Sequence, residues 1–210
     1  LRRGYLRKEH LTEDGHRTIL GLPGPGDVVG EMPDRVMTYS LEAATEAEIC
    51  AFPGPSVSEI ARGNAAFWRA ILDDIHRQYQ QELAFAWLRS ALRCRPRLLA
   101  FLLMATEIMP SVAQPDGSVI VTIPVDRRDW ADLCNMTNES ISRQMTDLSA
   151  SGEVQSLGRG RYRLSDPQAL RRSPDLAGFP LATGRAQPPR WILSRSSQPQ
   201  EALLPRVAQA

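Results

Sequence analysis

Residues Thr137 to Leu148, "TNESISRQMTDL", have the pattern of a short helix with one polar and one apolar face. Glu139, Ser142 and Arg143 follow the spacing i, i+3 and i+4, which places their side chains on one helical face. The apolar residues fall on the other side, where they can pack against a core: Ile141, Met145 and Leu148. A polar face that is not needed for packing is either solvated, with a Glu139–Arg143 ion pair, or contacts a partner.

The sequence before this helix predicts a second helix and a tight turn. "DRRDWADLCNM" indicates a helix over residues 126–134, with Asp126 as its N-cap. Asn135 follows where a left-handed residue is expected, and Asn tolerates that conformation best after Gly. Thr137 then caps the next helix, predicted over 137–149. Two short helices joined in this way are typical of a helix-turn-helix.

The sequence after it predicts a wing. "EVQSLGRGRYRL", residues 153–164, has two short strands around a Gly-Arg-Gly turn. Arginines recur here and at the start of the first helix, where they suit phosphate groups. We predict phosphate contacts at Arg127, Arg128, Thr137, Ser140, Arg159 and Arg161, with Arg163 also on the hairpin. The 95–172 segment is therefore predicted to be a winged helix-turn-helix domain.

The polar helix face has the chemistry of base recognition. Arg donates two hydrogen bonds to guanine, and Glu accepts one from cytosine. The N-terminal end of the second helix is the part that enters the major groove. We predict base contacts at Asn138, Glu139, Ser142 and Arg143.

The N-terminal segment, residues 1–53, is predicted to be β-structure. "GYLRKEHL" alternates and precedes a turn at "TEDGH", and residues 39–53 suggest a strand pair turning near Thr45 and Glu46. Short strands with Gly and Pro turns favour a small roll or barrel. Because the chain begins within a strand-like stretch, we expect the first strands of the roll to be missing.

The middle segment, residues 54–94, is predicted to be a long helix that pairs with a second copy. From 57 to 93 there is no Pro, and apolar residues step by three and four as in a coiled coil. The alternative is that this seam packs on its own domain. The predicted dimer contacts are Trp68, Leu72, Ile75, Tyr79, Leu83 and Ala86.

The remaining segments complete an α+β chain. Residues 94–109 predict a core helix, 118–125 a strand, and "DPQALRR" a final helical turn or two. Residues 173–210 are rich in Pro, Gly, Ser, Gln and Arg, which predicts a disordered tail in which only Trp191–Leu193 could dock.

Composition excludes several classes of function. The formal net charge is +1, so only the local distribution of charge bears on nucleic acid. Cys50, Cys94 and Cys134 have no CxxC spacing and are expected to be buried, reduced thiols. No apolar run approaches the roughly 20 residues of a membrane span, and we expect a cytoplasmic protein. No metal-ligand cluster, phosphate loop or nucleophile motif indicates an enzyme.

On these residues the chain resembles the CRP/FNR family of transcription regulators over about residues 4–170. "IPVDRRDWADLCNMTNESISRQMTDLSASGEV" resembles the DNA-binding segment of that family, and "PGDVVGE" with "YSLEAATEAEICAFP" resembles its β-roll sensor domain. The family's E-x-x-S-R pattern falls on Glu139, Ser142 and Arg143, in the FNR-like version. The resemblance implies a homodimer that reads two inverted TTGAT-like half-sites in double-stranded DNA, with RNA polymerase as a further partner.

The sequence also departs from the family. Members that bind cyclic nucleotides hold the phosphate with an Arg-Ser pair, which here is Tyr39-Ser40, so we expect no tight cyclic-nucleotide binding. The Cys cluster of iron–sulfur members is absent, and haem binding through His10, His16 or His76 has no support. We therefore expect no cofactor and no metal. Activator and repressor cannot be distinguished.

One alternative stays open for the C-terminal domain. Winged helices also mediate contacts between proteins, and the near-neutral charge of the segment permits this. A protein-contact module would not need the Glu-x-x-Ser-Arg face together with the arginines of the wing.

Overall fold

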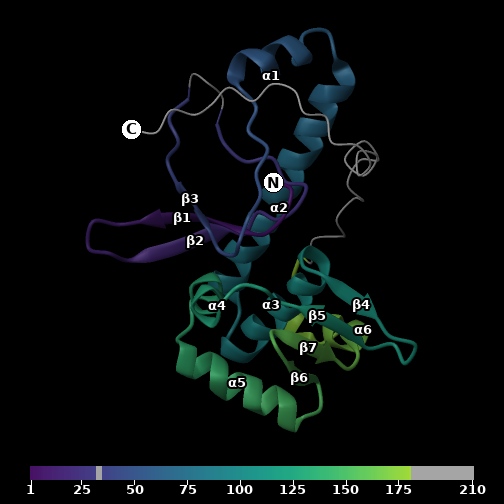
Figure 1. Cartoon of the computed structure of the whole chain (residues 1–210). Coiled ribbons are helices and arrows are strands. Elements are labelled where there is room, and N and C mark those ends of the chain that lie inside the picture. Colours follow the sequence, from purple (N-terminus) through teal and green to yellow (C-terminus); the bar gives the residue numbers. More distant parts are fainter. Residues whose placement is uncertain (32–34, 181–210) are drawn as a thin grey trace.

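Three antiparallel strands form the N-terminal part of the chain (Figure 1). The computed structural model describes residues 1–31 and 35–180. The strands are β1 (Leu6–Leu11), β2 (Arg17–Gly21) and β3 (Ser40–Ala43), in the order β2-β1-β3. β1 and β2 are a hairpin, as "GYLRKEHL" and the following turn predicted.

The predicted strand pair at 39–53 is wrong in its second half. After β3 the chain runs beside residues 2–5 and forms backbone hydrogen bonds with them, but its only β-pairing there among the described residues is an isolated bridge, Arg3 with Glu48. Gly4 lies opposite with φ +82°, and a Cβ there would be 2.2 Å from the carbonyl oxygen of Glu46. Because the two backbones approach so closely at Gly4, they do not continue as a regular ladder.

The predicted long helix is also corrected: it is two helices. α1 (Gly54–Ala61) and α2 (Ala65–Ala91) are separated by a break at Gly63, whose φ of +73° is left-handed. Asn64 then caps α2 by accepting a hydrogen bond of 3.0 Å from the backbone N–H of Phe67. The 27 residues of α2 still include all six predicted dimer residues.

The C-terminal part is built around α3 (Cys94–Ile108), which is buried on nearly all sides from Leu98 to Ala105. A four-stranded sheet has the order β4-β5-β7-β6. Its strands are β4 (Ser111–Ala113), β5 (Val119–Thr122), β6 (Val154–Gly158) and β7 (Arg161–Leu164). The sequence predicted β5 and the β6–β7 hairpin but missed β4, whose three residues are all exposed and leave no alternating pattern.

The remaining helices are α4 (Arg127–Cys134), α5 (Asn138–Ala150) and α6 (Pro167–Arg171), all near their predicted bounds. Figure 1 places α5 at the outer edge of the molecule, at the end opposite α1. The mixed α and β architecture predicted from the sequence is confirmed.

The start of the predicted disordered tail is ordered. Residues Pro174–Leu176 form a short 3-10 helix, and Leu176 and Phe179 are buried. The ring of Phe179 packs 5.3 Å from that of Trp87 on α2. These two side chains pack the segment against the core of the chain. The rest of the predicted tail, including Trp191–Leu193, lies outside the described residues.

Candidate nucleic-acid interface

The turn between α4 and α5 has the geometry that the sequence predicts. Asp126 caps α4 by accepting a hydrogen bond of 2.8 Å from the N–H of Asp129. Asn135 is left-handed with φ 48°, and Thr137 caps α5 by accepting 3.1 Å from the N–H of Ser140. Arg97 on α3 donates to the carbonyl oxygens of Cys134 and Asn135, at 3.2 and 2.9 Å. Sequence reasoning missed Arg97, because its partners are backbone atoms of a distant segment.

α5 presents its polar face to solvent. Its apolar residues Ile141, Met145 and Leu148 are buried. All four predicted base contacts are exposed on the outer side of the helix: Asn138, Glu139, Ser142 and Arg143. The predicted ion pair between Glu139 and Arg143 does not form among the described residues. Both side chains therefore remain available to a partner.

Three consecutive residues at the turn of the wing have positive φ, beginning with Gly158 at 78°. Arg159 and Gly160 have φ of 52° and 71°, the combination that a tight hairpin turn requires. A Cβ at position 160 would lie 2.7 Å from the carbonyl oxygen of Ile123, so only Gly fits there. This close approach fixes the wing against the end of β5.

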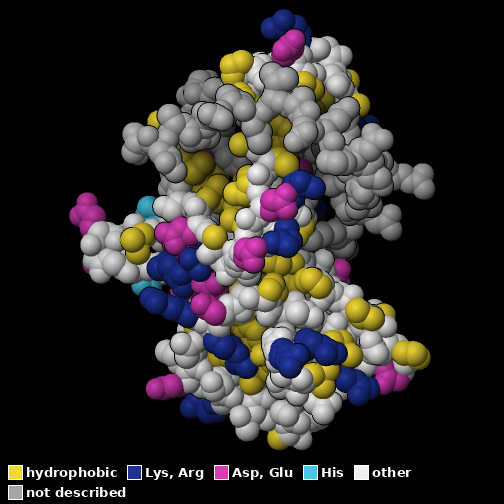
Figure 2. All heavy atoms as spheres, in the orientation of Figure 1, with side chains coloured by type: hydrophobic (Ala, Val, Ile, Leu, Met, Phe, Trp, Pro, Cys, Tyr) yellow, Lys and Arg dark blue, Asp and Glu magenta, His cyan; other side chains and the backbone are white. Residues whose placement is uncertain are grey.

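A shallow hollow lies between α5 and the wing. Its lining includes four hydroxyl side chains and one arginine, and consists of Arg127, Ser142, Met145, Thr146, Ser149, Ala150 and Ser156. Arginine side chains gather over this end of the molecule, where α4 and the wing lie (Figure 2). Hydroxyls and guanidinium groups are the side chains that proteins use to contact DNA phosphates.

Arg127 is held in place by two aromatic residues. Its guanidinium lies 4.6 Å from the ring centroid of Trp130 and donates 3.2 Å to the hydroxyl of Tyr162. Both rings are buried, so they form a rigid support. The arginine therefore reaches the hollow with its orientation already fixed.

The other predicted phosphate contacts differ in availability. Arg128, Arg159 and Arg161 are exposed, and no ion pair holds them within the described part of the chain. Thr137 and Ser140 lie at the N-terminus of α5, where the hydroxyl of Thr137 donates 3.0 Å to that of Ser140.

Arg163 was expected to face phosphates with the other wing arginines and does not. It donates 2.9 Å to the hydroxyl of Ser118 and pairs with Asp116. Hydrogen bonds from Ser118, together with Arg163, lower the pKa of Asp116. Because β5 is paired with β7, the turn before β5 lies beside Arg163 and engages it.

α2 carries a second uncovered surface. The predicted dimer residues form one exposed face: Trp68, Leu72, Ile75, Tyr79, Leu83 and Ala86. Five of them are large apolar side chains with between 40% and 61% of their surface exposed. The opposite face of the same helix packs into the core through Ala84, Phe85 and Leu88. Within the described residues this face is uncovered, which argues against the alternative that the seam packs on its own domain.

The thiols are not all buried as expected. Cys50 and Cys94 are exposed, and only Cys134 is buried. Burial raises the pKa of the Cys134 thiol to about 12, which keeps it protonated and unreactive.

Among residues 1–31 and 35–180, no group of three His, Cys, Asp or Glu side chains could hold a metal ion. In the same residues, no helix is long and apolar enough to cross a membrane.

Comparison with known proteins shows which family this chain is similar to. Residues 96–173 match the Crp-like helix-turn-helix domain. A "Probable transcriptional activator" of Rhizobium leguminosarum is 30% identical over 155 residues, which are 72% of this chain and 62% of that protein. The nitrogen fixation regulation protein FixK of Bradyrhizobium diazoefficiens is 27% identical, over 78% of this chain and 68% of that protein. The chain thus spans less than two thirds of the Rhizobium relative.

Solved structures agree on the fold. A CRP-family transcriptional regulator from Thermus thermophilus has a TM-score of 0.66 at 24% sequence identity. The match covers 84% of this chain and 86% of the Thermus chain. FixK2 from Bradyrhizobium japonicum has the same TM-score at 21% identity, covering 80% and 82%. Residues 96–173 thus carry a Crp-like helix-turn-helix domain, and the chain is similar in sequence and fold to transcription regulators of the CRP/FNR family.

Proposed function

We propose that this chain is a DNA-binding transcription regulator that acts as a homodimer and places α5 in the major groove of its operator. The observation that carries the proposal is the uncovered polar face of α5. It lies beside a hollow lined in part by hydroxyl groups and beside a wing whose Arg159 and Arg161 are exposed and form no ion pair within the described residues. The exposed side chains of the α5 face make no contact with the core, which α5 reaches through Ile141, Met145 and Leu148.

We propose that side chains at the N-terminal end of α5 contact the bases. Arg143 is proposed to donate to a guanine, and Glu139 to accept from a cytosine, with Asn138 and Ser142 beside them. Since the face has the E-x-x-S-R pattern, the proposed half-site is TTGAT. Arg127, Arg128, Thr137, Ser140, Arg159 and Arg161 are proposed to contact phosphates.

The dimer is proposed to form through the exposed face of α2. A continuous apolar face on a helix of this length is stabilised by a second helix packed against it. Two copies related by a twofold axis present two α5 helices, which matches an inverted repeat with half-sites about one DNA turn apart.

The proposal extends to partners and location. The Rhizobium relative is named as an activator, so we propose activation through contact with RNA polymerase in the cytoplasm, without enzymatic activity. We propose no cyclic nucleotide, iron–sulfur cluster or haem. Tyr39 stands where nucleotide-binding members have Arg, and its ring lies under the Lys8 ammonium, 4.2 Å from the centroid.

Fluorescence anisotropy tests the proposal. The purified chain is titrated on a labelled duplex with TTGAT-N4-ATCAA and on a scrambled duplex, each across a salt series. We expect tight, salt-sensitive binding with a large preference for the palindrome. Absence of binding to either duplex at low salt would contradict the proposal and favour the protein-contact alternative.

A further inference from the structure

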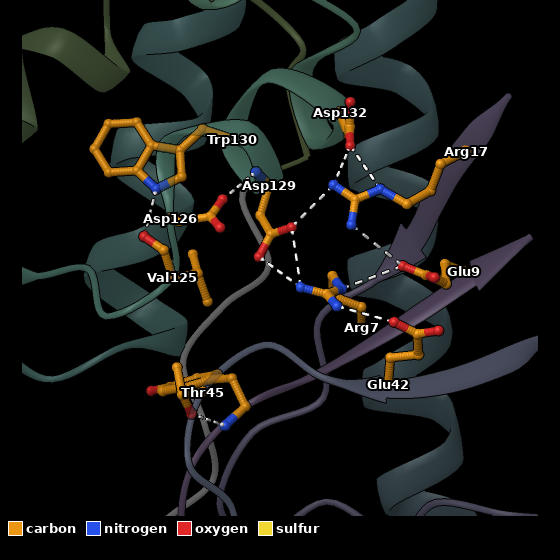
Figure 3. Close-up of polar contacts among 11 residues, drawn as sticks. Arg7, Glu9, Arg17, Glu42, Thr45, Val125, Asp126, Asp129, Trp130 and Asp132 are labelled. Atoms are coloured by element: carbon orange, nitrogen blue, oxygen red, sulfur yellow. Dashed lines mark hydrogen bonds and ion pairs between the residues drawn. The ribbon is translucent and has the colours of Figure 1, made fainter. Parts of the chain in front are cut away.

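A cluster of charged side chains joins the N-terminal sheet to α4, the first helix of the helix-turn-helix (Figure 3). Arg7 on β1 donates to both carboxylate oxygens of Asp129, at 3.4 and 3.3 Å. Arg17 on β2 donates 3.1 Å to Asp129 and, through Nε, 2.8 Å to Asp132. Residues more than 100 positions apart in sequence thus form one network, which no local pattern predicts.

Two glutamates of the sheet fix the arginines from the other side. Glu9 lies 3.2 Å from Nε of Arg7 and 3.7 Å from Arg17. Glu42 on β3 accepts 3.1 Å from the remaining terminal nitrogen of Arg7. Every guanidinium nitrogen of Arg7 therefore has a carboxylate partner. Together these partners hold the Arg7 side chain in a single orientation.

The cluster is shielded from water. The side chain of Asp129 is 1% exposed, and those of Arg7 and Arg17 are 15% and 17% exposed. Burial raises the pKa of Asp129, and the charge of Arg7 opposes this effect. Buried ion pairs are sensitive to geometry, because a displaced partner leaves a desolvated charge behind. The cluster therefore favours one position of α4 against the sheet.

The same two strands also contact α2. Lys8 lies 3.0 Å from Glu82, and Arg89 donates 2.9 Å to the carbonyl oxygen of Ile19. The sheet thus links the helix that carries the dimer surface to the helix that positions α5. The recognition face of α5 remains exposed, so the ion cluster does not block DNA.

We propose that Arg7, Arg17, Asp129 and Asp132 form an interdomain latch that fixes the angle between α2 and the helix-turn-helix. The latch sets the distance between the two recognition helices of a dimer, and its opening permits other operator geometries. A signal that shifts the sheet reaches α4 directly through this contact. The predicted effect of the latch on DNA binding rests on the proposed function. Its predicted effect on hydrogen exchange in the free protein does not.

The test uses two matched variants of the full chain. Arg17→Gln removes one arm of the latch, while Arg7 still neutralises Asp129, and Asp132 is exposed enough to hydrate. Arg3→Gln is the control. It makes the same charge change in the N-terminal part, but among the described residues the Arg3 side chain forms an ion pair only with exposed Glu46, in that same part. Two measurements follow for each: hydrogen exchange without DNA, and affinity for operators with spacers of two to six base pairs.

Each base pair added to the spacer moves one half-site away from the other by about 3.4 Å and rotates it about the DNA axis by about 35°. The wild type and Arg3→Gln should therefore prefer one spacer strongly. In Arg17→Gln this preference should fall at least about fivefold, and exchange of the α4 amides should rise. An unchanged spacer preference, or unchanged exchange in α4, would overturn the latch. If the wild type ignores every operator but exchange in α4 still rises, the proposed function fails and the latch stands.

Discussion

Helices α2 and α5 each keep one face uncovered, but the two faces have opposite chemistry. On α2 the face is a run of apolar side chains, five of them 40% to 61% exposed. On α5 it is polar and includes an arginine and a glutamate that pair with nothing in the described chain. An exposed apolar face is stabilised by another apolar surface, whereas an unpaired polar face suits hydrogen-bonding groups such as base edges. This difference agrees with the two proposed partners, a second copy for α2 and DNA for α5.

The largest expected effect comes from placing a charge on the α2 face. Ile75→Glu should abolish the dimer and lower operator affinity by about 100-fold or more, because the two half-sites are then bound independently. Sedimentation velocity and anisotropy measure the two effects. Gln80→Glu, an exposed position on another face of α2, is the control and should stay dimeric. A dimeric Ile75→Glu protein would show that this face has another role.

A smaller effect is expected from the α5 face. Arg143→Ala should cost about 1–3 kcal/mol of binding free energy and relax the preference at one base of each half-site. The thermal stability should not change, because the side chain is exposed and unpaired. Anisotropy against duplexes with each half-site base changed in turn measures this. If all base preferences survive, α5 does not read the sequence through Arg143.

The wing should have a weaker and less selective effect. Arg159→Asn keeps the left-handed turn and removes the charge. Affinity for all sequences should fall by the same factor, and the slope of log K against log salt should decrease by about 2 for the two copies in a dimer. Arg163→Gln serves as the control, because Arg163 is already engaged by Asp116 and Ser118. Equal slopes for Arg159→Asn and the wild type would remove the wing from the interface.

The smallest effect is expected at the turn that holds α5. Asn135→Gly should change the free energy of unfolding by less than about 1 kcal/mol, since Gly adopts the left-handed conformation without strain. Operator affinity should stay within about twofold of wild type. Chemical denaturation and anisotropy check both values. A large loss of stability would mean that the Asn135 side chain, rather than its backbone conformation, supports the turn.

The sequence predicted the elements of the C-terminal domain well because their signals are local. Caps at Asp126 and Thr137, a left-handed Asn135 and a Gly-rich hairpin turn depend on residues close to them. It failed where the cause is distant or subtle. The break at Gly63 interrupts an otherwise continuous apolar period, and the engagement of Arg163 depends on a turn 45 residues away.

The candidate site shows the same division. Residue types and spacing identified the polar face of α5 as well as the apolar face of α2. The support of Arg127 by Trp130 and Tyr162 and the cluster around Asp129 exist only in three dimensions. Side chains that bring separate segments together leave no periodic pattern in any one of them.

Selection from a pool of randomised duplexes, followed by sequencing, tests most directly whether a dimer reads DNA through α5. The account predicts enrichment of an inverted repeat with two TTGAT-like half-sites about one helical turn apart. Arg143→Ala in the same selection should lose the preference at one symmetric pair of positions. Enrichment of a single half-site without its inverted copy, or of no sequence at any salt concentration, would contradict the account.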